Sequence, residues 1–463
     1  MGKLKVLLAS SEVVPFAKTG GLADVAGALP LVLEALGVDV RVIMPRYGSI
    51  KAVGESAAIG KNVKVYFAAS DEYFSRPELY GDKFGDYKDN LDRFTFFSKA
   101  IFNILKKDNF KPDVIHCNDW QTALVPVYLN TLYKYDPFFS KTKTVFTIHN
   151  LAYQGLFPKE EFPKIGLDWS LFNMHLFEFY GKVNLMKAGI VYADMINTVS
   201  PTYAEEIQTK EFGCGLEGVI AERRDRLVGI LNGIDYKIWN PAFDNKIFKK
   251  YSINNFADKY TDKARLQEEA GLKVNSRIPL IGVISRLADQ KGFDLVADII
   301  DKVLAMDLQF ILLGTGEHKY HVLFEKIQKT YSKNAAIYLK FDAILAQKIY
   351  AGSDMFLMPS RYEPCGLGQL ISFKYGTVPI VRQTGGLKDS VDEFDPSTGE
   401  GSGFTFTSYE SGRLLAAIKK AVSAYGNKNA WEALTKKIMG YDYSWKRSAE
   451  DYVDLYERAR EQS

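Results

Sequence analysis

The chain has 463 residues, of which 47% are hydrophobic, so it is long enough for two domains that each bury a core. Its formal net charge of +3 is too small to make nucleic acid or an anionic membrane the expected partner. Cys117, Cys214 and Cys365 are odd in number and far apart, which argues against a disulfide framework and for a reducing compartment. The first apolar run is too short for a secretion signal, and no run approaches the length of a membrane span. We therefore expect a cytoplasmic enzyme or binding protein.

Strands and helices are expected to alternate through the first half of the chain. A strand over 6–9 leads to Lys18-Thr-Gly-Gly-Leu-Ala-Asp24, a helix over about 22–36 ends at Gly37, and a second strand covers 38–44. This β–α–β order predicts a parallel sheet. Further strands are expected over 113–116, 143–149 and 195–199, and further helices over 100–107, 121–132 and 183–192. Residues 54–99 are aromatic and charged with loop signals at Pro77, Gly81 and Gly85, and an irregular insertion is expected over 150–172.

A second alternating series follows a segment rich in turn signals. Asn232-Gly233 and Asn240-Pro241 are such signals, so we expect one domain over 1–240 and another over 241–443. The last segment, 444–463, is expected to form one amphipathic helix led by Trp445. The strands of the second domain are expected over 278–284, 308–313, 336–340, 355–358 and 378–382. The predicted fold is α/β, with two doubly wound, Rossmann-like domains that face a central cleft.

Two cations lie in a predicted connection between a strand and a helix of the second domain. Arg286 and Lys291 stand five positions apart, directly after the strand over 278–284. Fixed cations at the carboxyl end of a strand, beside the amino terminus of a helix, suit a diphosphate. The alternative is that both are solvated loop charges.

Two Gly-Gly turns each follow a strand and open a helix. Lys18 to Asp24 resembles Gln383-Thr-Gly-Gly-Leu-Lys-Asp389. Gly20 and Gly21 would let the backbone approach a ligand closely, the amides of the following helix would bind an anion, and Lys18 would add a charge. The alternative is a tight turn with a purely structural role.

Polar side chains end two neighbouring strands of the first domain. His149 ends the strand over 143–149, and His116 and Asp119 are expected at the end of the strand over 113–116. Because ligands bind at the carboxyl edge of a doubly wound sheet, these residues are candidates for a site. A histidine with a structural role is the alternative.

Glu363 lies between the strand over 355–358 and a helix over 369–375. Its carboxylate could bind sugar hydroxyls, and the amides of 366–368 could meet a phosphate; the alternative is a carboxylate that caps the helix. Cys365 is expected to be a packed small residue, because no histidine is near it in sequence. No Asp-x-Asp sequence occurs, so we expect no metal, and Arg286 and Lys291 would instead neutralise a leaving diphosphate.

Taken together, these motifs resemble those of the bacterial glycogen synthases and plant starch synthases, which are retaining glucosyltransferases of the GT-B fold. The match is collinear over nearly the whole chain, and the absence of a transit peptide favours the bacterial type. The shared segments are Lys-Thr-Gly-Gly-Leu-Ala-Asp at Lys18, His-Asn-Leu-Ala-Tyr-Gln-Gly at His149, Leu-Asn-Gly-Ile-Asp at Leu231, Ser-Arg-Leu and Gln-Lys-Gly from Ser285, Arg-Tyr-Glu-Pro-Cys-Gly-Leu at Arg361 and Thr-Gly-Gly-Leu at Thr384.

The resemblance implies ADP-glucose as donor, the non-reducing end of an α-1,4-glucan such as glycogen as acceptor, and no cofactor. It implies that the final helix packs back on the first domain, which holds the acceptor, while the second domain holds the nucleotide sugar. It assigns catalysis to His149, Arg286, Lys291 and Glu363. The implied donor contacts are Lys18, Gly20, Gly21, Asn232, Arg286, Lys291, Glu363, Cys365, Gly366 and Leu367, and the implied acceptor contacts are Asp119, Tyr153 and Gln154. Gly368 is a departure, because many relatives carry threonine there.

Two alternatives stay open at this point. One is a related GT-B enzyme that uses UDP-glucose or another acceptor, and the other is a glucan-binding protein of the same fold without activity. The second would be expected to have lost site residues, and Lys18, His149, Arg286, Lys291 and Glu363 are all present. Since Glu363 has no obvious carboxylate partner, we expect front-face attack rather than a covalent intermediate. The oligomeric state does not follow from the sequence.

Overall fold

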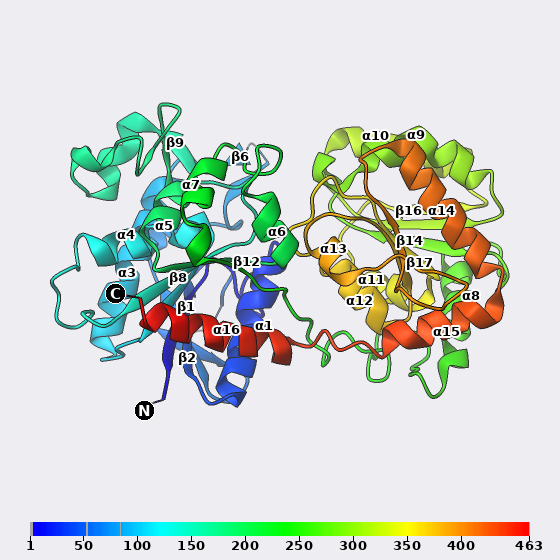
Figure 1. Ribbon diagram of the computed structural model, residues 1–463, viewed down its shortest axis with the longest axis horizontal. Helices are drawn as coiled ribbons and strands as arrows, with labels where there is room; N and C mark the ends of the chain where they lie inside the picture. The colour runs from blue at the N-terminus through cyan, green and yellow to red at the C-terminus, as the bar shows by residue number, and fades with distance from the viewer. Residues whose placement is uncertain (1–2, 52–53, 84, 463) are drawn as a thin grey trace. The chain divides into compact units, whose positions relative to one another are not determined.

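The chain divides into two units, which Figure 1 shows in a computed structural model that describes residues 3–51, 54–83 and 85–462. Unit 1 comprises Met1–Asn232 and Trp445–Ser463, and unit 2 comprises Gly233–Ser444. The division lies at the Asn232-Gly233 turn, earlier in the chain than position 240. Among the described residues, no helix is long and apolar enough to cross a membrane.

Unit 1 is built on an eight-stranded sheet with the order β13-β12-β8-β7-β1-β2-β4-β3. Neighbouring strands are parallel except for β3 and β4. The order runs outward in both directions from β1 and β7, and this reversal is where a doubly wound sheet binds ligands. The strands are β1 (Lys5–Ala9), β2 (Asp39–Pro45), β3 (Ser56–Ile59), β4 (Val63–Ala68), β7 (Val114–Asn118), β8 (Lys143–Ile148), β12 (Met195–Thr198) and β13 (Leu227–Gly229).

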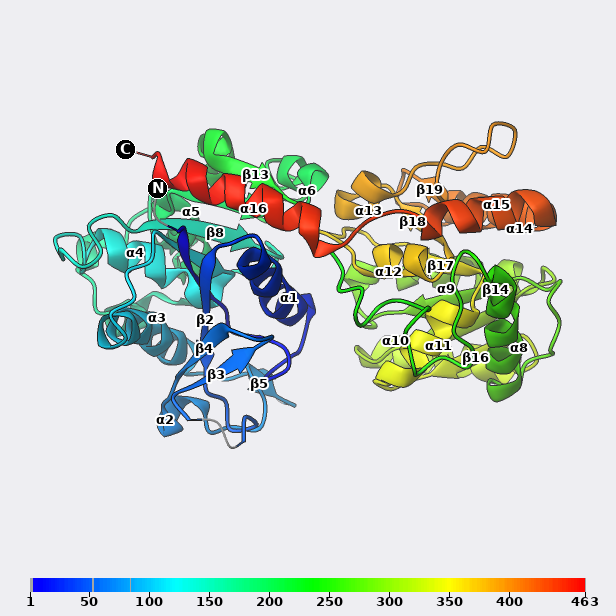
Figure 2. The same ribbon diagram turned by 90° about the horizontal axis from the view of Figure 1, so that it is seen from below.

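Helices cover both faces of this sheet. α1 (Gly21–Ala35) and α16 (Trp445–Arg460) pack side by side, with α16 across β7, β8 and β12 (Figure 2). α3 (Asn90–Lys107), α4 (Leu124–Asn130) and α5 (Leu185–Tyr192) pack one against the next on the other side. The smaller elements are α2 (Asp71–Phe74), α6 (Pro201–Glu206), α7 (Glu217–Glu222), β5 (Gly81–Asp82), β6 (Gly85–Asp86), β9 (Leu156–Pro158), β10 (Glu178–Phe179), β11 (Lys182–Asn184) and the 3₁₀ turns η1 (Trp120–Thr122), η2 (Lys159–Ile165), η3 (Trp169–Leu171) and η4 (Arg224–Arg226).

His116 anchors α16 to the sheet. It is fully buried, with Nδ1 2.8 Å from the Tyr456 hydroxyl of α16 and Nε2 2.5 Å from Thr147 Oγ1. Burial lowers the pKa of His116 to about 3, so the imidazole is neutral. The prediction that His116 lies at the ligand-facing edge was wrong, because β7 continues past it to Asn118.

Unit 2 is built on a six-stranded parallel sheet with the order β16-β15-β14-β17-β18-β19. The order reverses between β14 and β17. Its strands are β14 (Leu280–Ile284), β15 (Gln309–Leu313), β16 (Ala335–Tyr338), β17 (Met355–Met358), β18 (Val378–Arg382) and β19 (Phe404–Phe406). Its helices are α8 (Lys259–Glu269), α9 (Phe293–Leu304), α10 (His318–Thr330), α11 (Ala343–Gly352), α12 (Gly368–Lys374), α13 (Gly385–Ser390), α14 (Ser411–Tyr425), α15 (Lys428–Met439) and the 3₁₀ turns η5 (Phe256–Asp258) and η6 (Asp289–Lys291).

Side chains of the central strands of unit 2 alternate between two cores. Leu280 and Ile311 belong to one hydrophobic cluster, while their neighbours Ile281 and Phe310 belong to another. A parallel sheet is normally buried on both faces in this way, which explains why these strands are apolar without interruption.

The parallel sheets confirm the predicted fold class, and the strands over 355–358 and 378–382 match β17 and β18. The sequence showed loop signals over 54–99 and predicted no strand or helix there, whereas the structure has β3, β4 and the first part of α3 in this segment. Buried phenylalanines hold α3 in the core of unit 1, where Phe94 and Phe97 are fully buried. Tertiary packing therefore fixes a helix in a segment whose sequence pattern is weak.

Candidate active site

Lys18 stands at the carboxyl edge of the unit 1 sheet. Its Nζ lies 2.7 Å from Asp24 Oδ1, and the two side chains are 44% and 36% exposed. This ion pair holds the ammonium beside the first turn of α1, where helix amides favour an anion. An added Cβ on Gly20 would meet no atom within 4 Å, so the chain itself does not require glycine there. Close approach by a ligand remains a physical reason for it.

His149 and Asp119 lie together at the same edge. Asp119 adopts a positive φ of 56° and accepts the backbone N–H of His149 at 2.8 Å. His149 Nε2 lies 2.8 Å from Asn118 Oδ1, and Asn118 turns that oxygen toward it because its own Nδ2 donates to Ala9 O at 3.0 Å. The Nε2 of His149 therefore carries the proton, and Nδ1 keeps its lone pair.

Burial sets the charge of both side chains. It lowers the pKa of His149 to about 3, so this imidazole stays neutral at physiological pH. Burial raises the pKa of Asp119 to about 7, against the opposing effect of hydrogen bonds from the backbone of His149 and Asn150. Asp119 therefore changes its charge near neutral pH, whereas His149 does not.

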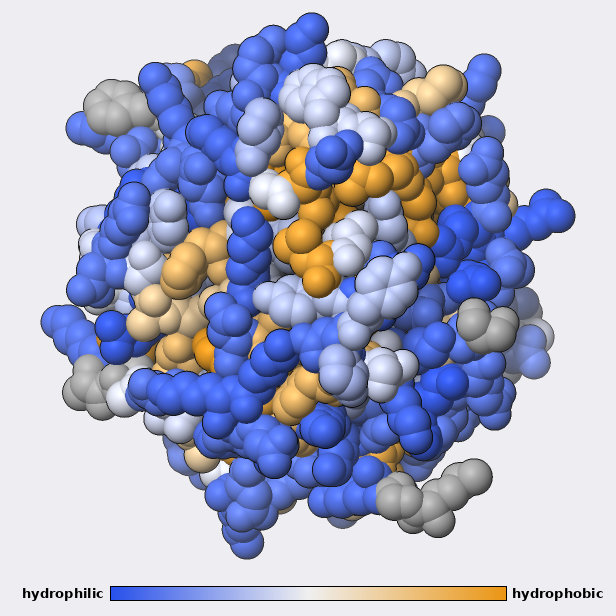
Figure 3. Space-filling view, turned by 90° about the vertical axis from the view of Figure 1, so that its left-hand side faces the viewer, coloured by the Kyte–Doolittle hydropathy of each residue, from blue (hydrophilic) through white to orange (hydrophobic). Residues whose placement is uncertain are grey.

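The insertion that follows His149 is partly apolar at its surface. Tyr153 is 53% exposed, and Trp169, Met174 and Tyr180 are 51%, 70% and 84% exposed. Hydrophobic patches interrupt the hydrophilic face of unit 1 in Figure 3. Gln154, in contrast, is buried: its Nε2 donates to Cys214 O at 3.1 Å and its Oε1 accepts from Asn184 at 2.6 Å. Gln154 thus ties the insertion to the rest of unit 1.

Lys291 and Glu363 form an ion pair at the carboxyl edge of the unit 2 sheet. Lys291 Nζ lies 2.9 Å and 2.7 Å from the two carboxylate oxygens of Glu363, and Ser360 Oγ donates to the same carboxylate at 2.8 Å. The Lys291 and Glu363 side chains are only 17% and 9% exposed. The sequence predicted separate roles for the two residues, and the structure brings them into contact.

The loops after β14 and β17 are joined by a backbone hydrogen bond and by a side-chain hydrogen bond of Gln290. Arg361 N–H donates to Gln290 O at 2.8 Å, and Gln290 Nε2 donates to Tyr362 O at 3.2 Å. Gly292 has a φ of +74°, and an added Cβ would lie 2.0 Å from Pro359 O. Sequence reasoning missed Gln290, although its place inside the Ser285 to Lys291 motif was a signal.

The second Gly-Gly turn packs against the backbone of Glu363. An added Cβ on Gly385 would lie 2.0 Å from Glu363 O, and one on Gly386 would lie 1.9 Å from Cys365 O. Gly386 N–H also donates to Glu363 O at 3.1 Å. Glycine is therefore required here by the chain, unlike at Gly20, so the two similar turns meet different constraints.

The other predicted donor contacts of unit 2 lie in the same two loops. Arg286 is exposed, Cys365 is buried, Gly366 has a φ of +70° and Leu367 occupies the N-cap position of α12.

Packing of neighbouring side chains explains why position 368 holds glycine rather than the threonine of many relatives. An added Cβ would lie 2.9 Å from Phe356 Cε1 and 3.1 Å from Met358 Sδ, so these side chains crowd the space that a threonine would need.

Asn232 is the last residue of the first segment of unit 1. It is 4% exposed, and its Oδ1 has no hydrogen-bond partner within the part of the chain that the structure describes.

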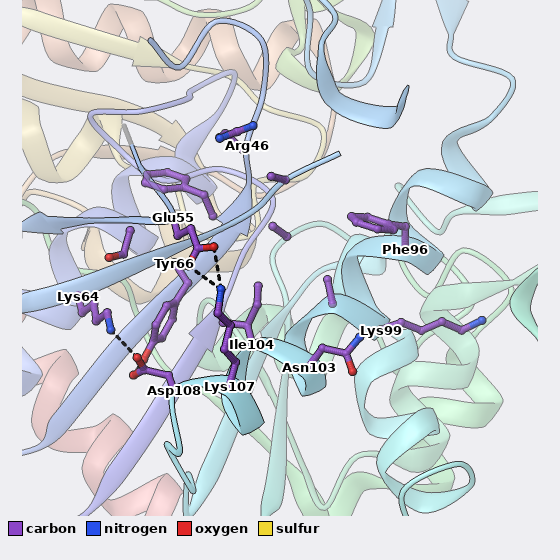
Figure 4. A pocket seen from close by; sticks show the side chains of 15 residues that line it. Arg46, Glu55, Lys64, Tyr66, Phe96, Lys99, Asn103, Ile104, Lys107 and Asp108 are labelled. Carbon is purple, nitrogen blue, oxygen red and sulfur yellow. Dashed lines mark hydrogen bonds and ion pairs between the residues drawn. The ribbon is translucent and has the colours of Figure 1, made fainter. Parts of the chain in front are cut away.

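A pocket of about 470 Å³ lies elsewhere in unit 1, between β4 and α3 (Figure 4). Its rim carries the ion pairs of Lys107 with Glu55 and of Lys64 with Asp108. None of the predicted site residues lines it. Among the described ranges 3–51, 54–83 and 85–462, no group of three or more His, Cys, Asp or Glu side chains could hold a metal ion.

Doubly wound sheets bind nucleotides and related ligands at their carboxyl edge, where both units carry cations and a carboxylate or imidazole. Family comparisons agree. A model described as starch synthase catalytic domain matches residues 5–222, and one described as glycosyl transferases group 1 matches residues 265–437. The protein is therefore a glycosyltransferase.

Individual relatives narrow the class. The chain is 48% identical to glycogen synthase of Thermotoga maritima and to glycogen synthase 2 of Geobacter sulfurreducens, over 98% of this chain and 99% of either relative. The catalytic domain of starch synthase IV from Arabidopsis thaliana, solved with ADP and acarbose, is 34% identical with a TM-score of 0.90 over 99% of this chain and all of that one. A sucrose-phosphate synthase from Thermosynechococcus elongatus, at 16% identity and a TM-score of 0.66 over 98% and 99% of the two chains, shares the fold. The chain belongs to the glycogen and starch synthase family, which confirms the prediction from its motifs.

Proposed function

We propose that the protein transfers glucose from ADP-glucose to the non-reducing end of an α-1,4-glucan, with retention of configuration, during glycogen synthesis. The Lys291–Glu363 pair at the reversal of the unit 2 sheet carries the proposal, because it places a cation and a sugar-binding carboxylate side by side. The glycogen synthases that match the whole chain support the acceptor, and the ADP bound by the starch synthase IV domain supports the donor.

Arg286 and Lys291 meet the negative charge that builds on the diphosphate as glucose leaves. Arginine offers a planar fork for two oxygens, and lysine offers three donors on one ammonium. Lys291 can therefore turn one donor to a phosphate while it keeps another on Glu363. Fixed cations of this kind need no rearrangement at the moment of reaction, which is why they lower the barrier.

Glu363 and His149 hold the transferred glucose. The Glu363 carboxylate accepts from sugar hydroxyls and supports the positive charge that develops at the anomeric carbon. The Nδ1 lone pair of His149 accepts a further hydroxyl, because Nε2 is committed to Asn118. Asp119 fixes the backbone of His149, and Tyr153 offers a ring face to the acceptor.

The bond changes are those of front-face displacement. The bond between the anomeric carbon and the phosphate oxygen breaks as the acceptor hydroxyl forms its bond from the same side. The departing diphosphate takes the hydroxyl proton, so no protein base is needed. The amides at the start of α1, together with Lys18, bind the diphosphate in the same step.

The test is a transfer assay with purified protein, glycogen, and either ADP-glucose or UDP-glucose, scored by nucleotide release and by labelled glucose in the polymer. A variant with both Lys291→Ala and Glu363→Gln, purified identically, controls for contaminating activity. We expect incorporation at chain ends with ADP-glucose as the better donor. Faster transfer from UDP-glucose would overturn the donor, and nucleotide release without glucose in glycogen would overturn the acceptor.

A further inference from the structure

Glu12 is a buried carboxylate of unit 1 that none of the motifs above includes. It is 4% exposed and accepts hydrogen bonds from four donors. The N–H and the hydroxyl of Thr19 donate to it, each at 2.5 Å. The Gly20 N–H donates at 3.1 Å and the Tyr80 hydroxyl at 2.7 Å.

These hydrogen bonds show which amides of the first Gly-Gly turn are already used within the chain. The amides of Thr19 and Gly20 are directed at a carboxylate of the chain itself, so they do not point to a donor phosphate. Gly20 is the N-cap residue of α1 and has no side chain with which to cap the helix, so we assign the first-turn amides, together with Lys18 beside them, to a ligand. Glu12 thus binds the backbone of the turn at Thr19 and Gly20, while an added Cβ on Gly20 would meet no atom within 4 Å.

The same carboxylate joins three separate segments. Glu12 follows β1, Thr19 and Gly20 precede α1, and Tyr80 precedes β5, with its hydroxyl also 2.7 Å from Ser11 Oγ. Burial of a carboxylate is unfavourable unless it is fully hydrogen-bonded, and apolar packing would join the segments without that cost. What a carboxylate adds is a fixed orientation of the amides that it accepts, and Lys18 is the residue next to them.

We propose that Glu12 is a positioning residue of the transfer reaction, which holds the turn that carries Lys18 in place against the donor diphosphate. The proposal rests on the proposed function, because that function assigns Lys18 to the donor.

The variant Glu12→Gln tests this, because an amide nitrogen cannot accept the bonds that one carboxylate oxygen accepts. The matched control is Glu55→Gln, the same substitution at a carboxylate that is 83% exposed and paired with Lys107 (Figure 4). A displacement of about 1 Å in a positioning group costs about 10²-fold in rate, so we expect Glu12→Gln to lower kcat/KM for the donor by about that factor. The KM for glycogen and the rate of the control should change less than about twofold.

A double-mutant cycle with Lys18→Ala separates positioning from general damage. If Glu12 acts through Lys18, Glu12→Gln should lower the rate by less than about threefold when Lys18 is already alanine. Full multiplication of the two effects would overturn the proposal, as would wild-type kinetics for Glu12→Gln.

A milder pair of variants covers the case in which Glu12→Gln fails to fold. Thr19→Val deletes only the hydroxyl bond to Glu12, and Thr19→Ser restores it. We expect a loss of about tenfold for valine that serine largely recovers, and equal rates for the two would count against Glu12. If the wild type prefers another nucleotide sugar, the same ratios measured with that donor still test Glu12, so failure of the proposed function is distinguishable.

Discussion

Removing Lys291 should cost the protein stability as well as activity, because Lys291 neutralises a buried carboxylate. Glu363 is 9% exposed on its side chain, and its charge is met by Lys291 at 2.7 Å and by the Ser360 hydroxyl at 2.8 Å. Breaking a buried pair by removing one partner typically costs 3–5 kcal/mol. Since Lys291 is itself 17% exposed and water can replace it in part, we expect about 2 kcal/mol for Lys291→Ala.

The double variant isolates this effect. With Glu363→Gln in the same chain, no charge is left unpaired, so the second substitution should recover much of the lost stability. Urea unfolding that reports on unit 2 measures the free energies for the two single variants and the double variant. A coupling energy of about 1–2 kcal/mol is expected from the cycle.

Adding Glu363→Gln to Lys291→Ala should recover stability but not activity. Lys291→Ala should lower kcat by about 10²–10³, because the leaving diphosphate loses a preorganised cation. Glu363→Gln should lower kcat strongly too, and adding it to Lys291→Ala should not restore activity. If Lys291→Ala were as stable as the wild type, or if Glu363→Gln had no stability effect in its background, the ion pair would not be a buried interaction of the kind described.

Three further predictions follow from individual contacts. Gly385→Ala should destabilise unit 2, because its Cβ would lie 2.0 Å from Glu363 O, whereas Gly20→Ala should unfold at the wild-type temperature and yet lose activity. Thermal unfolding and initial rates of both variants check this, and unaltered rates for Gly20→Ala would contradict a close approach of the ligand to this glycine. Burial raises the pKa of Asp119 from its usual 3.8 to about 7, so between these pH values the folded chain keeps a proton that the unfolded chain has lost. The contribution of Asp119 to the free energy of unfolding therefore falls as pH rises through this window, by at most about 1.4 kcal/mol per pH unit. Asp119→Asn should lack this fall, and unfolding curves of both proteins at about pH 5, 6, 7 and 8 should diverge in favour of the variant; parallel curves would contradict the raised pKa. Activity should survive EDTA, since Arg286 and Lys291 are assigned the charge that a metal would otherwise meet, and a complete loss that Mg²⁺ or Mn²⁺ restores would contradict that assignment.

The fold was predictable because its signals are local and repeated. Apolar runs such as 355–358 and 378–382 alternate with helix patterns, and that order specifies a parallel sheet without knowledge of any contact. The region of β4 and α3 was not predictable in this way, because its order comes from buried aromatic side chains rather than from a regular pattern. His116 was misjudged for a similar reason: its partner Tyr456 lies in the last helix.

The candidate residues could be named from sequence, but the relations between them could not. Lys291 and Glu363 are 72 positions apart, and they meet where the backbone at Gly292 closely approaches Pro359 O and the backbone at Gly385 closely approaches Glu363 O. The two Gly-Gly turns look alike in sequence, although one is crowded by backbone and the other is open. Glu12 carries no motif, and only its four hydrogen bonds reveal that it holds the turn beside Lys18.

The central claim is that fixed cations of unit 2 meet the charge of the departing diphosphate, and Arg286→Ala tests it most directly. The measurement is labelled glucose transferred from ADP-glucose to glycogen, as a function of donor concentration, for the wild type and the variant. The account predicts a kcat lower by about 10²–10³ with a donor KM changed by only a few-fold. A normal kcat with a raised donor KM would make Arg286 a ground-state anchor and would contradict the account.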